Sequence, residues 1–209
     1  MEDILYLYEQ PRDPDYPMVC FDETSKQLVK ETREPIPLKS GKAQRYDYEY
    51  ERNGVRNIFM FSAPLENFRH VEVTEHRKKS DWATMMKKLV DELFPTAKKI
   101  RLVEDNLNTH DPSSLYEVFK PKEARRILNK IEFHFTPKHG SWLDMAEIEL
   151  SVLNKQCLSR RIGDESILKS EIQAWEQKRN AAKKTIDWQF TNKDARTKLK
   201  KLYPSIKSC

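Results

Sequence analysis

Few cysteines and glycines are present in this chain, and their scarcity excludes several classes of protein. The three cysteines, Cys20, Cys157 and Cys209, lie far apart and never form a CxxC pair, so we expect reduced thiols, with neither a disulfide framework nor a structural zinc site. The four glycines are equally scattered. Walker loops and dinucleotide-binding fingerprints need clustered glycines, because their backbone approaches phosphate closely. ATPases, GTPases and Rossmann-type dehydrogenases are therefore excluded.

Long apolar runs and a secretory signal are also missing. The longest apolar stretches, such as residues 57–63, contain only a few residues, whereas a membrane-spanning helix needs about 20. The first residues carry acidic side chains where a signal peptide would have a basic n-region. We therefore expect a cytoplasmic protein without a membrane partner.

The sequence does contain enough apolar residues for a core, together with an uneven distribution of charge. Its 209 residues are 38% hydrophobic and 34% charged, which suits one domain with a small appendage. Residues 155–209 hold 14 Lys and Arg against 6 Asp and Glu, a net charge of +8; because the whole chain carries +5, the other 154 residues carry −3. A basic tail on an acidic body is typical of enzymes that act on polyanions, but lysine-rich helices are also ordinary solubilising surface.

The periodicity of apolar residues predicts strands first, then alternating helices and strands. Residues 1–17 contain three prolines and cannot form a continuous helix, so we expect the fold to begin at Met18, with an early turn at Asn53-Gly54. Strands are expected at 18–21, 27–29, 57–62, 70–74, 99–103, 131–135 and 186–190. Helices are expected at 82–94, 113–119, 121–129, 142–158, 164–182 and 194–202. This order predicts an α/β fold with a mixed sheet flanked by helices.

Acidic residues follow two of the predicted strands. Asp22 ends the first strand and Asp105 follows the strand at 99–103, so both are expected at the same edge of the sheet. A third acid on the helix at 142–158 would complete a cluster that needs divalent cations, because three adjacent carboxylates repel one another. Such a site performs phosphoryl transfer in nucleases and polynucleotidyl transferases. Spacing alone leaves open that these acids are ordinary solvated residues.

Several sequence segments resemble the signature motifs of a known family. They are VCFDET at 19–24, VEDNLNTH at 103–110 and TPKHGSWLDMAEIEL at 136–150, supported by RYDYEYE at 45–51, VEVTEHR at 71–77 and IQAWEQKRNA at 172–181. Together they resemble DDE transposases of the bacterial insertion-sequence six-thirty family, in the mariner-like superfamily. The resemblance implies an RNase H-like fold, with a mixed five-stranded sheet flanked by helices and extra C-terminal helices. It also implies that Asp22, Asp105 and Glu147 are the catalytic residues and hold two Mg²⁺ ions, with Mn²⁺ as a substitute. Between Asp105 and Glu147 lie 41 residues, more than in the eukaryotic mariner relatives, and the helical segment 113–129 accounts for the difference.

The choice of the third carboxylate depends on the resemblance. Helical periodicity places Glu147 and Glu149 on two different polar strips and does not choose between them. The W-L-N-x-x-E pattern of the family aligns with Trp142, Leu143, Asp144 and Glu147, so the resemblance selects Glu147. It also shows a departure, since Asp144 stands where the family usually has Asn.

Further residues in the matching motifs are expected to support the metal ligands or to contact DNA. His134 and His139 also invite a zinc interpretation, which is weak without paired cysteines. Trp142 suits a role as a core or helix-entry anchor better than stacking on a flipped base, and exposed basic residues without any role would look the same in the sequence. The expected supporting and DNA-binding residues are Glu23, Asn106, His110, Lys138, His139, Trp142, Arg160 and Arg161.

The resemblance also predicts a domain organisation and partners. We expect an N-terminal lead-in (1–17), a catalytic domain (18–160) and a basic helical extension packed on it (161–209). No segment before the first strand is long enough for the helix-turn-helix reader of the family, so we expect a separate or fused reader, a homodimer when active, and TA-containing DNA as target, near the bacterial nucleoid. The alternatives are a non-catalytic relic that only binds DNA or a partner, and a cellular RNase H-like nuclease that cleaves without joining.

Overall fold

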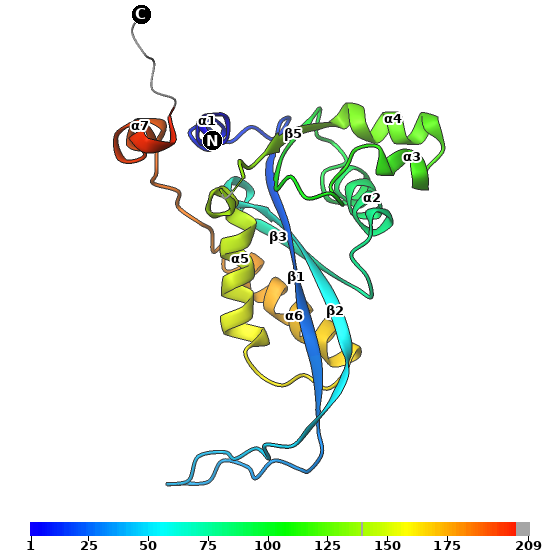
Figure 1. Ribbon diagram of the computed structural model, residues 1–209, viewed down its shortest axis with the longest axis vertical. Helices are drawn as coiled ribbons and strands as arrows, with labels where there is room; N and C mark the ends of the chain where they lie inside the picture. The colour runs from blue at the N-terminus through cyan, green and yellow to red at the C-terminus, as the bar shows by residue number, and fades with distance from the viewer. Residues whose placement is uncertain (139, 204–209) are drawn as a thin grey trace, which may run out of the picture.

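A mixed sheet of five strands forms the centre of the fold (Figure 1). The computed structural model describes residues 1–138 and 140–203. Across the sheet the order is β3 (Phe68–Thr74), β2 (Tyr50–Ala63), β1 (Met18–Glu31), β4 (Ile100–Glu104) and β5 (Ile131–Phe135). The first three strands pair antiparallel, whereas β1, β4 and β5 pair parallel. The predicted mixed five-stranded sheet is confirmed.

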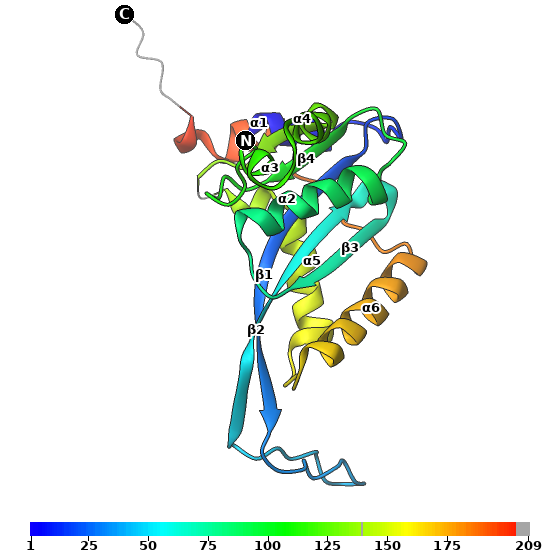
Figure 2. The same cartoon turned by 90° about the vertical axis from the view of Figure 1, so that its right-hand side faces the viewer.

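Helices cover both faces of this sheet, and each face has its own hydrophobic core (Figure 2). On one face lie α2 (Lys79–Lys88), α3 (Ser114–Val118) and α4 (Pro121–Lys130). On the other lie α1 (Glu2–Tyr8), α5 (Met145–Leu153), α6 (Glu165–Ala181) and α7 (Asn192–Lys198). None of the helices within 1–138 and 140–203 is both long and apolar enough to cross a membrane.

The two long strands β1 and β2 form a ribbon that extends beyond the rest of the sheet (Figure 1). The expected separate strand at 27–29 is wrong, because these residues continue β1. The expected turn at Asn53-Gly54 is also wrong: β2 runs through this pair, and the register shifts between Gln27 and Val29. Gly54 has a φ of +84°, so the conformation that Asn-Gly supplies to a hairpin turn is used here in a β-bulge.

Both ends of the chain depart from the sequence-based expectations. The fold begins before Met18, since α1 buries Ile4 and Leu5 completely in the core that it shares with α5. The expected strand at 186–190 is irregular; its apolar side chains pack against that core without pairing with a strand. The boundaries of the lead-in, the catalytic domain and the C-terminal extension stay predictions.

The helix expected at 142–158 is divided into three parts. A 3₁₀ turn (Ser141–Leu143) precedes α5, and the π-helical turn η4 (Asn154–Leu158) follows it. The α-helix begins only at Met145 because Asp144 is its N-cap and accepts a hydrogen bond from the Ala146 N–H at 2.8 Å.

Candidate active site

The pleat of two neighbouring strands turns Asp22 and Asp105 toward α5. Alternate residues of β1 separate between the cores: Met18 and Cys20 pack with α5, while Val19 and Phe21 pack with α2. Asp22 is the next member of the first series. Because side chains alternate across a strand, its carboxyl group faces the α5 side of the sheet.

The same alternation applies in β4. Val103 belongs to the core around α5, whereas Leu102 belongs to the core around α2, so Asp105 continues toward α5. Cys20 and Val103 are the last paired residues of the parallel β1–β4 ladder. Asp22 and Asp105 each follow two residues later, on strands that lie about 4.8 Å apart. The sheet therefore brings these two acids to one place.

Glu147 and Glu149 occupy different environments on α5, although only two residues separate them. Glu147 is exposed in the first turn and lines the same groove as Asp22. The Glu149 side chain is only 1% exposed and forms ion pairs with Arg69 of β3 at 3.4 Å and with Arg179 of α6 at 2.8 Å. Glu147 is thus the glutamate on the side of the two aspartates, and Glu149 fastens α5 to its neighbours.

The carboxyl group of Asp22 responds electrostatically to its surroundings. Burial and, to a lesser extent, the nearby charges of Glu23, Asp105 and Glu147 together raise the pKa of Asp22 to about 7, against a hydrogen bond from the Glu23 N–H that lowers it. An acid with this pKa is poised to gain a positive partner, because a cation would favour its ionised form. The three predicted carboxylates are therefore electrostatic neighbours.

His110 connects two of the acidic residues. Its buried ring lies 2.8 Å from an Asp105 carboxylate oxygen and 3.0 Å from a Glu23 oxygen. Burial alone would lower the pKa of His110, but these two contacts raise it to about 11, and the same contact lowers the pKa of Asp105. Asp105 is thereby held toward His110. Within residues 1–138 and 140–203, no three Asp, Glu, His or Cys side chains are drawn together closely enough to ligate one ion.

Asp144 is buried next to the carboxylate groove. Its side chain caps α5 through one oxygen, and the other oxygen has no hydrogen-bond partner in the described part of the chain. Burial raises the pKa of Asp144 well above its usual value, and the charges of Asp22 and Asp105 add to this effect. The substitution of Asp for the family's Asn therefore adds a buried acid behind the site.

The other predicted residues fall into exposed and internally paired groups. Asn106 and Lys138 are exposed, and His139 lies outside the described residues. Trp142 is 42% exposed and stacks against Trp188 with ring centroids 6.3 Å apart.

Two arginines expected to contact DNA have acidic partners within the protein. Arg160 pairs with Glu171, and Arg161 pairs with Glu31 at 2.6 Å at the C-terminal end of β1. These contacts leave the proposed DNA-binding role of both arginines a prediction.

Sequence reasoning missed several residues that support the site. Glu104 is completely buried and accepts a hydrogen bond from the Trp82 indole at 3.0 Å; burial raises its pKa to about 8. The phenol of Tyr8, from α1, donates to the Leu143 carbonyl at 2.5 Å, just before the cap of α5. Arg69 escaped notice because an arginine in an alternating strand gives no sign that it is buried.

The oxygen donors at this edge of the sheet fit a hard divalent cation. Mg²⁺ and Mn²⁺ prefer carboxylate oxygens. The negative charges near Asp22, which raise its pKa, would favour a cation beside it. The histidine nearest to the site, His110, has both ring nitrogens engaged by Asp105 and Glu23. The donor set is therefore one of carboxylates.

Comparison with known proteins places the chain in a family. Residues 17–169 match the family model described as DDE superfamily endonuclease. The chain belongs to this superfamily. The match includes all three predicted carboxylates of the DDE domain, as well as β1–β5. No curated protein matches the sequence.

Solved structures of Mos1 transposase complexes share the fold of the DDE domain. The Mos1 strand transfer complex has a TM-score of 0.58 at 14% identity, covering 84% of this chain and 51% of that chain. The pre-cleavage Mos1 transpososome has a TM-score of 0.57 at 13% identity, covering 89% and 61%. The Mos1 mariner paired end complex with Mn has a TM-score of 0.56 at 15% identity, covering 85% and 52%. The chain thus spans little more than half of these proteins, and the predicted RNase H-like fold is confirmed.

Proposed function

We propose that this DDE domain is the catalytic part of an insertion-sequence transposase, which cleaves a DNA strand and joins the released 3′-hydroxyl to target DNA. The observation that carries the proposal is that Asp22 on β1 is exposed to the charges of Asp105, which follows β4, and of Glu147 on α5. Membership of the DDE endonuclease superfamily supports it. The Mos1 structures include complexes with Mn and with Mg, which supports the same choice of cation here.

The three carboxylates have distinct roles in this proposal. Asp22 and Asp105 would hold metal from the rigid sheet, and Glu147 would close the site from α5. When bound, a pair of Mg²⁺ ions, replaceable by Mn²⁺, would activate the attacking hydroxyl and neutralise charge on the leaving oxygen. His110 contacts Asp105 directly, and Glu23 holds the other nitrogen of the His110 ring, so the pair keeps Asp105 in place.

Strand cleavage and strand transfer test the proposal together. Supercoiled plasmid and a pre-cut DNA end are incubated with the full chain and Mn²⁺, with and without a helix-turn-helix reader protein. We expect nicking and joining by the wild type and a loss of more than about 100-fold for Asp105→Asn and Glu147→Gln, since loss of supporting residues alone costs metal sites up to about that factor. Asp111→Asn is the matched control. Asp111 lies in the loop that follows Asp105, its side chain is 47% exposed, and it accepts a hydrogen bond from the Ser113 N–H.

The outcome also separates the alternatives. Cleavage without joining would favour a cellular RNase H-like nuclease. DNA binding without either reaction would favour a relic. We further propose a cytoplasmic location at the nucleoid, a homodimer in the active complex and TA-containing targets, all of which rest on the family resemblance.

A further inference from the structure

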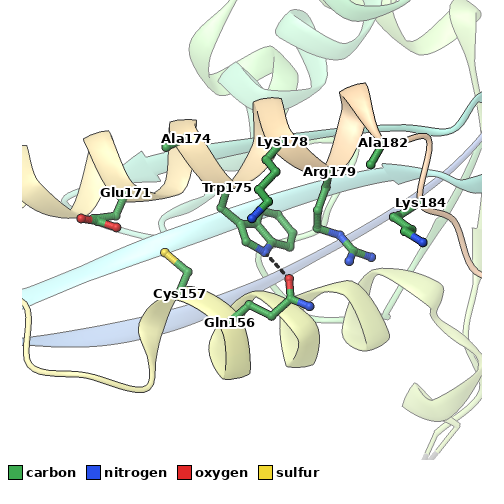
Figure 3. Close-up of a pocket in the computed structure, with 9 residues that line it drawn as sticks. All are labelled: Gln156, Cys157, Glu171, Ala174, Trp175, Lys178, Arg179, Ala182 and Lys184. Carbon is green, nitrogen blue, oxygen red and sulfur yellow. Dashed lines mark hydrogen bonds between the residues drawn. The ribbon is translucent and has the colours of Figure 1, made fainter.

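A second pocket lies between α6 and the π-helical turn η4, away from the carboxylates (Figure 3). Asn154 and Leu158 line the carboxylate groove, whereas Gln156 and Cys157 line this pocket, so η4 separates the two. The cavity measures about 530 Å³. Its size falls in the range of ligand-binding clefts, and neither the predicted catalytic residues nor their supporting residues line it.

The charge in this pocket is positive. Lys178, Arg179 and Lys184 reach its edge, as Figure 3 shows. Arg179 pairs with the buried Glu149 at 2.8 Å, and the acidic Glu171 at the other end pairs with an arginine outside the pocket. No acidic group among the described residues lies within ion-pair distance of Lys178 or Lys184. Two uncompensated ammonium groups therefore remain.

The C-terminus of α6 explains only part of this charge. Lysines near a helix C-terminus offset its dipole, which is equivalent to roughly half a negative charge. Here backbone N–H groups already cap the final carbonyls, with Lys183 bonding Asn180 at 3.0 Å and Lys184 bonding Arg179 at 3.3 Å. Two full positive charges exceed half a negative one, so the pocket favours an anion.

Some polar groups inside the pocket contact one another. The Trp175 indole donates to the Gln156 side chain at 2.9 Å, and the Arg179 guanidinium lies over the Trp175 ring at 5.4 Å. The indole N–H and the Gln156 side-chain oxygen are therefore already paired. Ala174 and Ala182 keep the opening wide. A phosphate group linked to a larger body fits these features, because flexible lysines contact it without sequence preference.

We propose that this pocket binds a backbone phosphate of duplex DNA and is a DNA contact separate from the carboxylate site. The choice of DNA rests on the proposed function; the phosphate chemistry rests on Lys178, Lys184 and the open cavity. Free phosphate offers the same chemistry, and the experiment separates the two sources.

The test compares two charge-matched double variants of the full chain. Lys178→Gln with Lys184→Gln removes the pocket lysines, which are exposed and so tolerate the change; Lys193→Gln with Lys200→Gln removes two exposed lysines of the same basic segment. Binding of a short duplex is measured over a range of salt concentrations. Each lost phosphate contact lowers the salt slope by about 0.9, so we expect a decrease of about 0.9 for the pocket variant, which loses one phosphate contact. The control should change the slope by less than half as much.

A second readout locates the ligand. Duplex DNA should shift the indole N–H resonance of Trp175 in the wild type and not in the pocket variant. An unchanged salt slope, or an equal loss in the control, would overturn the proposal. A Trp175 shift with inorganic phosphate but none with duplex would show a site for free anions instead. A changed oligomeric state of the pocket variant with unaffected duplex binding would show that the pocket binds an acidic protein segment. Either result overturns the proposal.

The proposed function can fail separately from this inference. Nicking by the wild-type chain with Mn²⁺ tests the catalytic proposal, whereas the salt slopes of the two lysine variants test the pocket. Full nicking together with unchanged DNA binding would reject only the pocket. Normal pocket-dependent binding without any nicking would reject only the catalytic proposal.

Discussion

Asp144 begins the helix that carries Glu147, and it does so with a carboxyl group that is 2% exposed. Its raised pKa means that ionisation is unfavourable in the folded protein. The loss of stability caused by this buried acid is absent below its usual pKa of 3.8 and grows as the pH rises above that value. An asparagine keeps the capping oxygen and removes the charge.

We therefore expect Asp144→Asn to raise the free energy of unfolding by about 1–2 kcal/mol at pH 7, and to have little effect near pH 3.5. Urea unfolding at both pH values measures this. Asp164→Asn is the control, since Asp164 caps α6 in solvent and its pKa is lowered, first by the Ile167 N–H. A loss of stability in Asp144→Asn at pH 7 would contradict the interpretation.

The two glutamates of α5 make opposite predictions. Glu149→Gln leaves Arg69 and Arg179 facing a neutral partner in the interior, so unfolding should become easier by about 3–5 kcal/mol. Glu147→Gln changes an exposed side chain and should alter stability by less than about 0.5 kcal/mol while activity is lost. Thermal melts and nicking assays on both variants give the comparison. Activity retained in Glu147→Gln would reverse the assignment.

At the scale of elements, the end of α6 holds a lysine in a conformation that favours glycine. Lys183 has a φ of +49° and follows Ala182 in a Schellman turn closed by Lys183 and Lys184 N–H groups. Glycine adopts this conformation without steric strain. Lys183→Gly should thus stabilise the protein by about 0.5–1 kcal/mol. Ala182→Gly, at a right-handed residue, should destabilise it, and denaturant melts of both test the sign.

The contact between β3 and α6 contains a titrating histidine. Burial would lower the pKa of His70, but hydrogen bonds to Glu176 and Glu72 raise it to about 9 despite the nearby Lys88. A raised pKa contributes stability that is complete below the usual 6.5 and is lost as the pH rises through about 9. Glu72, whose pKa is lowered to about 2, stays ionised throughout this window.

We expect the wild type to lose stability between pH 6.5 and 9.5 and His70→Gln to lose less over the same range. Urea midpoints at the two pH values measure the difference. His76→Gln is the control, because His76 is exposed near the end of the same strand. Equal pH dependence in wild type and His70→Gln would show that His70 does not carry the effect.

Across the whole molecule, local patterns predicted what local interactions decide. The apolar alternation at Met18–Phe21 and the helical spacing of Trp82, Met85 and Met86 correspond to β1 and α2. The Asn53-Gly54 pair led to a wrong prediction, because a positive φ at glycine occurs both in turns and in bulges. Only the pairing of β2 with the long strand β1 decides between them. The sequence could not show that β1 and β2 stay paired beyond the rest of the sheet.

The candidate site was predictable only where a motif named its residues. The pairing of Glu149 with Arg69 and Arg179 joins three elements far apart in the sequence, and no periodicity marks it. The contact of His110 with Glu23 likewise spans 87 residues. Burial of α1 was missed because three prolines follow it and a seven-residue helix gives little periodic signal. These features depend on packing between residues far apart in the sequence, which local sequence patterns do not reveal.

The most direct test of the account is calorimetric titration of Mn²⁺ into the full chain and its carboxylate variants. We expect the wild type and Asp111→Asn to bind about two equivalents, as a two-metal phosphoryl-transfer site requires. Asp22→Asn, Asp105→Asn and Glu147→Gln should each lose at least one equivalent while remaining folded. Identical Mn²⁺ titrations in the wild type and all three variants would contradict a shared metal site at Asp22, Asp105 and Glu147.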